Sequence, residues 1–426
     1  MSPSNELPDP LDPIAVRRNV HAHPELGFCE IRTADLIWRT LHCLGWSVTG
    51  GRDLTDATGY PGLPPPEDLD AAREDARAAG VEPAMVDRLA GGHTAMVADL
   101  DGNRPGARVA IRIDIDALPI TESAGADHLP AAEGFASRYP GRMHACGHDG
   151  HIAVGLDLAA RLAAHRDFPG SVRLLIQPAE EGVRGAALLT AADVCQDVDA
   201  LIAFHFGFGM PLGHVAPATD LLATTKLRAT FNGAAAHAGN APQDGRHALL
   251  AAATGTVGLH GLPRFPGTAT RVNVGTLYAG GAPNIVPARA QLQAEVRAGS
   301  AQVHSELDRR ARQVLHAAAA MHEVGVTIDV TGSATTAVND ESVLNAVAAA
   351  APGADLTYAD PHPLGASDDA TLLMAATQAR GGQAAYVLIG SGTYGPHHSP
   401  SFDLDESALP RAASLLETAI RAGIRP

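Results

Sequence analysis

Short apolar runs alternate with helical patterns along this chain, and that alternation constrains the fold more than any other sequence feature. Ala107–Ile115 alternates apolar and polar residues as a strand does. Three shorter apolar runs fit buried strands: Ser171–Gln177, Ala200–His205 and Ala384–Gly390. A helical pattern over Ile152–His165 lies between the strands Ala107–Ile115 and Ser171–Gln177. Strands that alternate with helices indicate an α/β core with a mixed, mostly parallel sheet.

A second pattern occupies residues 224–334, where strands and helices are expected in the order β-α-β-β-α-β. This order is typical of a ferredoxin-like domain. The six expected elements are Thr225–Phe231, Arg246–Leu262, Thr270–Leu277, Ala288–Val296, Gln302–His322 and Val324–Thr331. The 426 residues exceed the roughly 250–300 at which a single core stops growing. We therefore expect a catalytic domain formed by residues 1–223 and 335–426, with a dimerisation or lid domain over 224–334 inserted into it.

Residues 50–93 form a predicted excursion from the core. Turn-forming residues at 59–62 and a proline run at 64–66 precede a helix, expected at about 67–90, that is rich in alanine and charged residues. A solvated surface helix with a proline-rich loop is the expected role. A contribution to the substrate site or to a dimer contact is the alternative.

The overall charge and the cysteines restrict the partners and the compartment. A formal net charge of -16 argues against nucleic acids and anionic membranes, because both bind basic surfaces. Four widely spaced cysteines do not resemble a disulfide framework. The N-terminus has no basic stretch before an apolar run, and no window approaches about 18 apolar residues, so neither a signal peptide nor a membrane span is expected. We therefore expect a cytoplasmic protein.

The densest group of reactive side chains lies between His144 and His151, where five residues that can bind metals occupy eight positions. Cys146 and His148 carry the thiolate and imidazole groups that bind borderline metals such as zinc, manganese or cobalt, and Asp149 could join them. One alternative is a loop with surface histidines. Another is a nucleophilic Cys146, which would need a single base and no metal.

Acidic and histidine side chains also stand where strands end. Glu180 and Glu181 follow the strand that ends at Gln177, and adjacent side chains point in different directions. One carboxylate could therefore bind metal while the other accepts a proton from water whose pKa the metal lowers to about 7. His205 ends another strand, at the edge where open α/β sheets bind ligands.

Two further positions could support this site. His398 lies in a turn after the strand Ala384–Gly390 and is another candidate ligand, with the adjacent His397 as its competitor. Asp114 and Asp116 lie on one face at the end of their strand, where they could orient a ligating histidine through its second ring nitrogen. A solvated sheet edge is the alternative interpretation of the two aspartates.

Taken together and in this order, the motifs resemble the amidohydrolase branch of the two-metal aminoacylase and carboxypeptidase family. That branch contains hippurate hydrolases, N-acyl-amino-acid amidohydrolases and auxin-conjugate hydrolases. The resemblance extends from Arg17 to Glu406. It implies two divalent metal ions per subunit, Mn²⁺ or Zn²⁺, with Co²⁺ and Ni²⁺ also compatible with such a ligand set. The implied ligands are Cys146, His148, Glu181, His205 and His398.

The resemblance also implies roles for four other residues. Glu180 would act as the general base and acid that moves a proton from the bridging water to the leaving amine. His237, in the inserted domain, would reach the partner subunit's active site and stabilise the tetrahedral oxyanion. Asn284 and Arg297 would contact the carboxylate of the substrate.

One subgroup, the p-aminobenzoyl-glutamate hydrolases, is the most similar through the excursion at 50–93 and the segments Asn232–Gly239 and Gly365–Thr371. It implies a metal-dependent amidohydrolase that releases an amino acid, glutamate first of all, from a small N-aroyl or N-acyl conjugate. The active protein would be a homodimer or a pair with a homologous second subunit. A general aminoacylase or dipeptidase is an alternative with the same chemistry. A non-catalytic metal-binding protein is an alternative of another class, and the presence of Glu180 argues against it.

Overall fold

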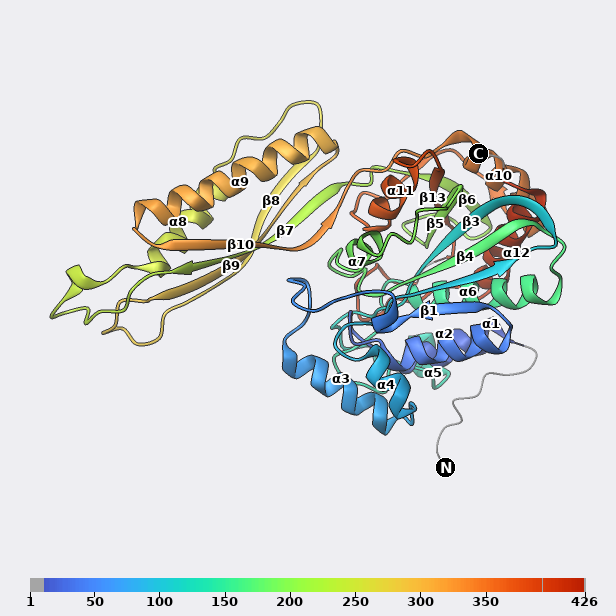
Figure 1. Cartoon of the computed structure of the whole chain (residues 1–426), viewed down its shortest axis with the longest axis horizontal. Helices are drawn as coiled ribbons and strands as arrows, with labels where there is room; N and C mark the ends of the chain where they lie inside the picture. The colour runs from blue at the N-terminus through green and yellow to red at the C-terminus, as the bar shows by residue number, and fades with distance from the viewer. Residues whose placement is uncertain (1–10, 393, 425–426) are drawn as a thin grey trace.

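The computed structural model describes residues 11–392 and 394–424. These residues form a large body and a smaller, elongated one that the strands β7 and β10 connect (Figure 1). The large body contains a nine-stranded sheet, and the small body contains a four-stranded sheet. Residues 1–10, which are part of the segment where no signal peptide is expected, lie outside the described residues.

Four parallel strands form the centre of the large sheet, in the order β4-β3-β5-β13. They are β3 (Arg104–Asp114), β4 (Pro169–Gln177), β5 (Ala200–Phe206) and β13 (Gln383–Ile389). These are the four strands that the apolar runs predict. Because the strands are parallel, their carboxyl ends meet at one edge of the sheet, which is where ligands bind in open α/β sheets.

Further strands widen this centre on both sides. β1 (Ser47–Gly50) and β2 (Met96–Asp101) add antiparallel strands next to β4, and β6 (His214–Thr219) lies antiparallel to β13. The short strands β11 (Thr357–Tyr358) and β12 (His362–Pro363) pair in parallel with β6. The sheet is therefore mixed, as the sequence predicts, with its parallel part in the middle.

Helices cover both faces of the large sheet and bury its apolar side chains. One face is covered by α1 (Pro13–His21), α2 (Ile31–Cys43), α6 (His148–Ala164), α10 (Glu341–Ala350) and α12 (Ala408–Ala422). The other face is covered by α7 (Ala186–Ala191) and α11 (Ala370–Gln378). α6 begins four positions before the predicted helix, so the residues from His148 onward belong to its first turn and not to a loop.

The excursion at 50–93 contains two helices where the sequence predicts one. α3 (Pro66–Ala78) and α4 (Pro83–Leu89) each begin with a proline, a residue that suits the first turn of a helix because its missing N–H is not needed there. Both helices bury a narrow apolar side against the large body and leave charged residues exposed. The remaining short helical turns are η1 (Gly51–Asp53), α5 (Leu129–Ala132), η2 (Pro242–Asp244) and η3 (Ala351–Ala354).

The small body follows the β-α-β-β-α-β order that the sequence predicts for 224–334. Its elements are β7 (Ala223–Asn232), α8 (Ala248–His260), β8 (Thr270–Ala279), β9 (Arg289–Ala298), α9 (Ala301–Met321) and β10 (Gly325–Ala334). The antiparallel sheet has the strand order β10-β7-β9-β8. α8 and α9 pack on one face through an apolar core that includes Phe231, Leu292 and Leu315. Neither helix covers the other face.

Among the described residues, no helix is both long and apolar enough to cross a bilayer.

Candidate metal centre

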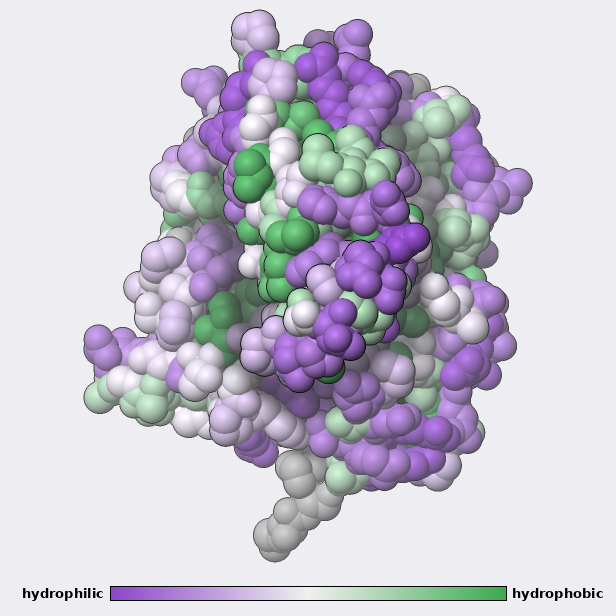
Figure 2. All heavy atoms as spheres, turned by 90° about the vertical axis from the view of Figure 1, so that its left-hand side faces the viewer, coloured by the Kyte–Doolittle hydropathy of each residue, from purple (hydrophilic) through white to green (hydrophobic). Residues whose placement is uncertain are grey.

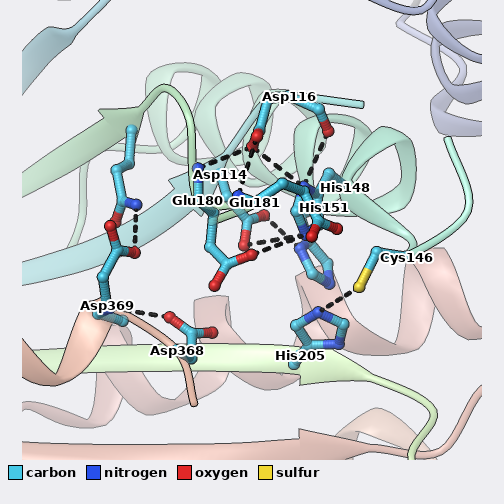
Figure 3. Close-up of polar contacts among 12 residues, drawn as sticks. Asp114, Asp116, Cys146, His148, His151, Glu180, Glu181, His205, Asp368 and Asp369 are labelled. Atoms are coloured by element: carbon cyan, nitrogen blue, oxygen red, sulfur yellow. Dashed lines mark hydrogen bonds and ion pairs between the residues drawn. The ribbon is translucent and has the colours of Figure 1, made fainter. Parts of the chain in front are cut away.

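Four of the five side chains that are expected as metal ligands come together at the carboxyl edge of the parallel strands: Cys146, His148, Glu181 and His205 (Figure 3). The fifth, His398, lies next to Glu181. Cys146, His148 and Glu181 offer ligand atoms that all lie within 4.8 Å of one another. The Sγ of Cys146 lies 3.5 Å from Nε2 of His205. Nε2 of His398 lies 3.3 Å from Oε1 of Glu181. The structure therefore brings the whole predicted set into one place.

The turn at Gly147 explains how two of these side chains reach the same point. Cys146 ends the loop before α6, and His148 is the first residue of that helix. Between them Gly147 adopts φ +98°, in the left-handed region that residues with a Cβ rarely occupy. The chain can therefore reverse within one residue, and the thiol and the imidazole face the same space.

Hydrogen bonds at Nδ1 orient the rings of His148 and His205, so that the Nε2 atom of each ring faces the site. Nδ1 of His148 donates to the carbonyl oxygen of Asp116 at 2.9 Å, and Nδ1 of His205 donates to that of Phe206 at 2.8 Å. Each bond places the proton on Nδ1 and leaves Nε2 with a free lone pair facing the site. Nε2 of His148 is buried and has no hydrogen-bond partner.

Asp114 and Asp116 both lie in the buried interior, so the interpretation as a solvated edge is wrong. The carboxylate of Asp116 accepts the backbone N–H groups of Glu180 at 2.9 Å and Glu181 at 3.0 Å, which fixes the turn that carries both glutamates. Asp114 lies 2.5 Å from Nδ1 of His151. His151 also accepts the N–H of Phe206 through Nε2, so neither of its ring nitrogens is left free.

The donor atoms suit a binuclear site for divalent metals. Burial raises the pKa of the Cys146 thiol well above its usual range, and the nearby Glu181 raises it further. A thiolate here therefore needs a bound cation, and the same shift argues against the alternative in which Cys146 is a nucleophile without metal. Oε1 of Glu181 is buried without a hydrogen-bond partner. Sulfur, nitrogen and oxygen donors together match borderline metals.

Glu180 lies beside this group and makes one long ion-pair contact with it. Its Oε2 is 3.9 Å from Nε2 of His148. Burial raises the pKa of Glu180 well above its usual range, and the carboxylates of Asp368 and Glu181 add to the effect. A carboxyl with a raised pKa can both accept a proton and hold it for transfer.

The sequence reasoning missed the charges that surround Glu180. Asp368 accepts a hydrogen bond from the Tyr386 hydroxyl at 2.5 Å and from Nη2 of Arg112 at 3.1 Å, and all three residues are buried. Arg112 also pairs with Asp114. A detectable signal existed, because Arg112 alternates with Asp114 and Asp116 at the end of a strand whose neighbouring positions are isoleucines.

His398 and its competitor His397 have different surroundings. His398 adopts φ +61°, its N–H donates to the carbonyl of Ala145 at 2.8 Å, and its half-exposed ring faces Glu181. Nε2 of His397 contacts the carbonyl of Phe206 at 3.2 Å, and its ring stacks on Phe208. Burial lowers the pKa of His397 to about 4. The geometry favours His398 as the ligand.

A cavity of about 300 Å³ opens beside these groups. Its walls include Glu180, Glu181, His205 and His398 from the large body. Lys226 and Arg297 reach it from the small sheet, so Arg297 lies at the wall of this cavity, and its contact with a substrate carboxylate stays a prediction. No residue of the excursion at 50–93 is among the described residues that line this cavity.

His237 and Asn284 lie elsewhere. They follow β7 and β8 on loops at the end of the small body that points away from the large one (Figure 1). The two loops bond to each other, with the N–H of Ala238 donating to the carbonyl of Asn284 at 3.0 Å. Both side chains are exposed, and neither lines the metal cavity of this chain. Figure 2 looks onto this end, where hydrophobic and hydrophilic residues both reach the surface. Ile285, next to Asn284, is one of the exposed hydrophobic residues.

Comparisons with known proteins agree with this geometry. Residues 110–422 match the family described as Peptidase family M20/M25/M40. The chain is 42% identical over 405 residues to an indole-3-acetyl-aspartic acid hydrolase of Enterobacter agglomerans, covering 94% of this chain and 93% of that protein. It is also 42% identical over 405 residues to one of the subunits of the p-aminobenzoyl-glutamate hydrolase of Escherichia coli, with the same coverage.

Two solved structures are also similar to this chain over nearly its whole length. The aminobenzoyl-glutamate utilization protein from Klebsiella pneumoniae aligns with a TM-score of 0.81 and 36% identity, over 96% of this chain and 95% of that one. A dinuclear metal-binding peptidase of the M20 family from Bacillus subtilis aligns with a TM-score of 0.66 and 25% identity, over 96% and 97% of the two chains.

Proposed function

The chain belongs to the M20/M25/M40 peptidase family, and from that membership we propose that it is a metal-dependent amidohydrolase that releases glutamate from p-aminobenzoyl-glutamate or a similar N-aroyl or N-acyl conjugate. The observation that carries this proposal is the convergence of five donor side chains beside Glu180 at one cavity. Two relatives that are 42% identical are named for hydrolysis of acyl conjugates of acidic amino acids.

In this proposal two divalent ions, Mn²⁺ or Zn²⁺ and alternatively Co²⁺ or Ni²⁺, are held by Cys146, His148, Glu181, His205 and His398. When bound, such ions lower the pKa of water and polarise the scissile carbonyl. Support comes from the ring nitrogens of His148 and His205, whose Nδ1 bonds direct Nε2 into the site. The oxygen Oε1 of Glu181 is likewise free of hydrogen bonds.

We assign the proton transfers to Glu180. The carboxylate accepts a proton from the attacking water, and the resulting carboxylic acid returns it to the amine as the amide bond breaks. The raised pKa of Glu180 supports this assignment, because a buried carboxyl beside Asp368 and Glu181 holds a proton more readily than a free one. The bonds from Asp116 to the backbone of Glu180 and Glu181 keep the two glutamates in different orientations.

We propose that His237 and Asn284 act in the cavity of a second subunit, and that Arg297 contacts the substrate carboxylate from within the same chain. Nδ1 of His237 accepts the N–H groups of Gly239 at 3.2 Å and Asn240 at 3.0 Å. The proton of the neutral ring is then on Nε2, which makes it a donor suited to an oxyanion. The exposure of His237 and its absence from its own cavity support a partner, either a second copy of this chain or a homologous protein.

The same proposal divides the chain into a catalytic domain, residues 1–223 and 335–426, and an inserted dimerisation or lid domain, residues 224–334. The four-stranded sheet and its two helices support the second unit, since they enclose an apolar core of their own. We also propose that the protein acts in the cytoplasm. All four cysteines are free thiols, which is the usual state in a reducing compartment.

A hydrolysis assay with metal reconstitution tests the proposal. Protein stripped with a chelator and reloaded with each of the four metals would be offered p-aminobenzoyl-glutamate, hippurate and simple acetyl-amino acids. We expect the highest kcat/KM for the glutamate conjugate with at least one metal and none in the stripped protein. Preference for acetyl-amino acids would favour the general aminoacylase instead. No hydrolysis with any metal would favour the non-catalytic alternative.

A further inference from the structure

Lys226 is the single lysine of the 426-residue chain, and it lines the metal cavity. It lies on β7 directly opposite Glu295 of β9. Residues directly opposite each other in an antiparallel pair project from the same face of the sheet, and Arg297 lies on that face as well, opposite Thr224. This is the face that α8 and α9 leave uncovered, and Lys226 and Arg297 on it form the roof of the cavity.

The two cations of this roof have different counter-charges. Nε and Nη2 of Arg297 contact the two carboxylate oxygens of Glu295 at 3.0 and 2.9 Å. Over residues 11–392 and 394–424, no carboxylate lies within ion-pair distance of the Lys226 ammonium, which is partly buried. Burial lowers the pKa of Lys226 and the nearby Arg297 lowers it further, whereas Glu295 and the more distant carboxylates of Glu180 and Glu181 oppose this effect only in part. An anionic ligand in the cavity would supply the missing counter-charge.

The position of Lys226 relative to the reacting groups is set by direct packing. Lys226 pairs with Gly332 of β10, and the N–H of the next residue, Ser333, donates to the carbonyl of Val183 at 2.8 Å. A Cβ on Gly332 would collide with the carbonyl oxygen of Gly182. Since residues 182–183 directly follow Glu181, the lysine is one strand away from the turn that carries both catalytic-site glutamates.

We infer that Lys226 is a specificity-determining residue whose ammonium binds the side-chain carboxylate of the amino acid to be released. Resting on the proposed function, this inference makes conjugates of glutamate and aspartate the substrate class. A conjugate with a neutral side chain would bury the ammonium and still leave it without a counter-charge, and a site with an unpaired buried polar group discriminates strongly.

The residue type supports this role. Of the 31 lysine and arginine residues only Lys226 is a lysine, so the chain places a lysine at this one position. An ammonium is a compact point charge on a flexible stem, whereas a guanidinium is a wide planar fork. The compact group suits a roof that Arg297 and Glu295 already occupy in part.

The inference is tested by removing the charge of Lys226 and comparing two conjugates that differ only in the charge of the amino-acid side chain. Lys226→Met removes the charge and keeps the length of the side chain. We expect kcat/KM for p-aminobenzoyl-glutamate to fall by about 10- to 100-fold, mainly through KM, because a hydrogen bond to a charged group is lost. For p-aminobenzoyl-glutamine, which has the same shape without the second charge, we expect a change of less than about 3-fold. Lys226→Arg should restore part of the loss for the glutamate conjugate.

Arg228→Met is the matched control. Arg228 lies on the same strand and face, two positions further from the cavity, and pairs with Asp329 at 3.4 Å. It does not line the metal cavity, so its replacement should leave the ratio between the two conjugates unchanged. If Lys226→Met lowers kcat/KM equally for both conjugates, or for neither, the inference is wrong while the proposed function stands. If the metal-loaded wild-type protein hydrolyses neither these two conjugates nor any other N-aroyl or N-acyl conjugate of glutamate, the proposed function itself is wrong.

Amine labelling gives a second readout that does not depend on turnover. The N-terminal amine and Lys226 are the only primary amines of this sequence that an acetylating reagent can modify, so mass spectrometry of the stable amide products reports both sites with the first as an internal reference. We expect free glutamate to slow acetylation of Lys226 relative to the N-terminus, and glutamine at the same concentration to leave the ratio unchanged. Equal protection by both amino acids, or by neither, would overturn the assignment of the side-chain carboxylate to Lys226.

Discussion

The metal centre and the outer end of the small sheet hold residues that we expect to act in one reaction, yet the two regions are built in opposite ways. At the metal centre, His148 and His205 are buried and each has one ring nitrogen bonded to a backbone carbonyl. At the outer end, His237 and Asn284 lie exposed on loops that bond mainly to each other. Under the proposed function, one chain therefore orients its own candidate metal donors, whereas the candidate oxyanion donor His237 needs a second subunit to reach a cavity.

The largest effect should come from the metal centre. Glu180→Gln removes the proton acceptor and keeps the shape of the side chain, and general-base catalysis is worth about 10²- to 10⁴-fold. We expect kcat to fall by that amount while the metal content, measured by mass spectrometry, stays at the wild-type level. A variant that kept more than a few per cent of wild-type activity would show that another group moves the proton.

A smaller loss should follow from a change at the outer end. His237→Ala removes one donor to the developing oxyanion, and such donors are worth about 10²- to 10³-fold in kcat. The metal content should again be unchanged, because His237 is absent from the metal cavity. His316→Ala, at an exposed histidine of α9 in the same small body, is the control and should have no effect.

Mixing the two inactive variants tests whether the regions belong to different subunits. In a dimer of one His237→Ala chain and one Glu180→Gln chain, one cavity has both an intact Glu180 and an intact His237 from its partner. We expect part of the activity to return in proportion to the mixed dimer. Mixed dimers that are verified by mass and still inactive would contradict the arrangement across subunits.

The smallest effect concerns the support behind the metal centre. His21 contacts Glu122 at 2.9 Å and Asp149 at 2.8 Å, and although burial opposes the charged form, these two carboxylates raise the pKa of His21 to about 9. A raised pKa means that the charged ring stabilises the fold fully below pH 6.5 and that this stabilisation is lost as the pH rises through 9. His21→Gln should flatten that decline.

Chemical denaturation at several pH values between 6.5 and 9, at constant metal concentration, measures this difference. Equal slopes of the free energy of unfolding in the wild type and in His21→Gln would show that the ring is neutral in the folded protein. A His316→Gln variant is the control and should show the wild-type dependence of unfolding free energy on pH. His316 lies exposed on α9, in the other body of the molecule from His21.

The sequence predicts the parts of the site that depend on local order along the chain. Glu180 and His205 stand at strand ends, and parallel strands bring such ends together, so their meeting follows from the pattern. The start of α6 does not follow from it, because histidine and glycine at positions 148–151 resemble a loop and the apolar pattern begins only at Ile152. The β-α-β-β-α-β order is predictable because each of its elements shows its own periodicity.

Contacts between distant segments cannot be predicted in this way. Arg112 bonds to Asp368, which lies 256 positions away, and no local sequence pattern at either residue predicts this pairing. Lys226 looks like any polar residue of an alternating strand until the fold shows that its face roofs the cavity. The exposure of His237 also depends on where the small body points, which no local pattern describes.

The close contact between Gly332 and the Gly182–Val183 turn has a consequence for inhibition. The strand β10 touches this turn directly, so a rotation of the small body about the contact must shift the backbone that carries Glu181. An antibody fragment or small molecule that binds the outer loops and turns the small body about this contact would change turnover without entering the cavity of the same chain. Because Asn284 on these loops is proposed to act on the substrate in the partner's cavity, we expect such ligands to lower kcat and also to raise KM for the conjugate.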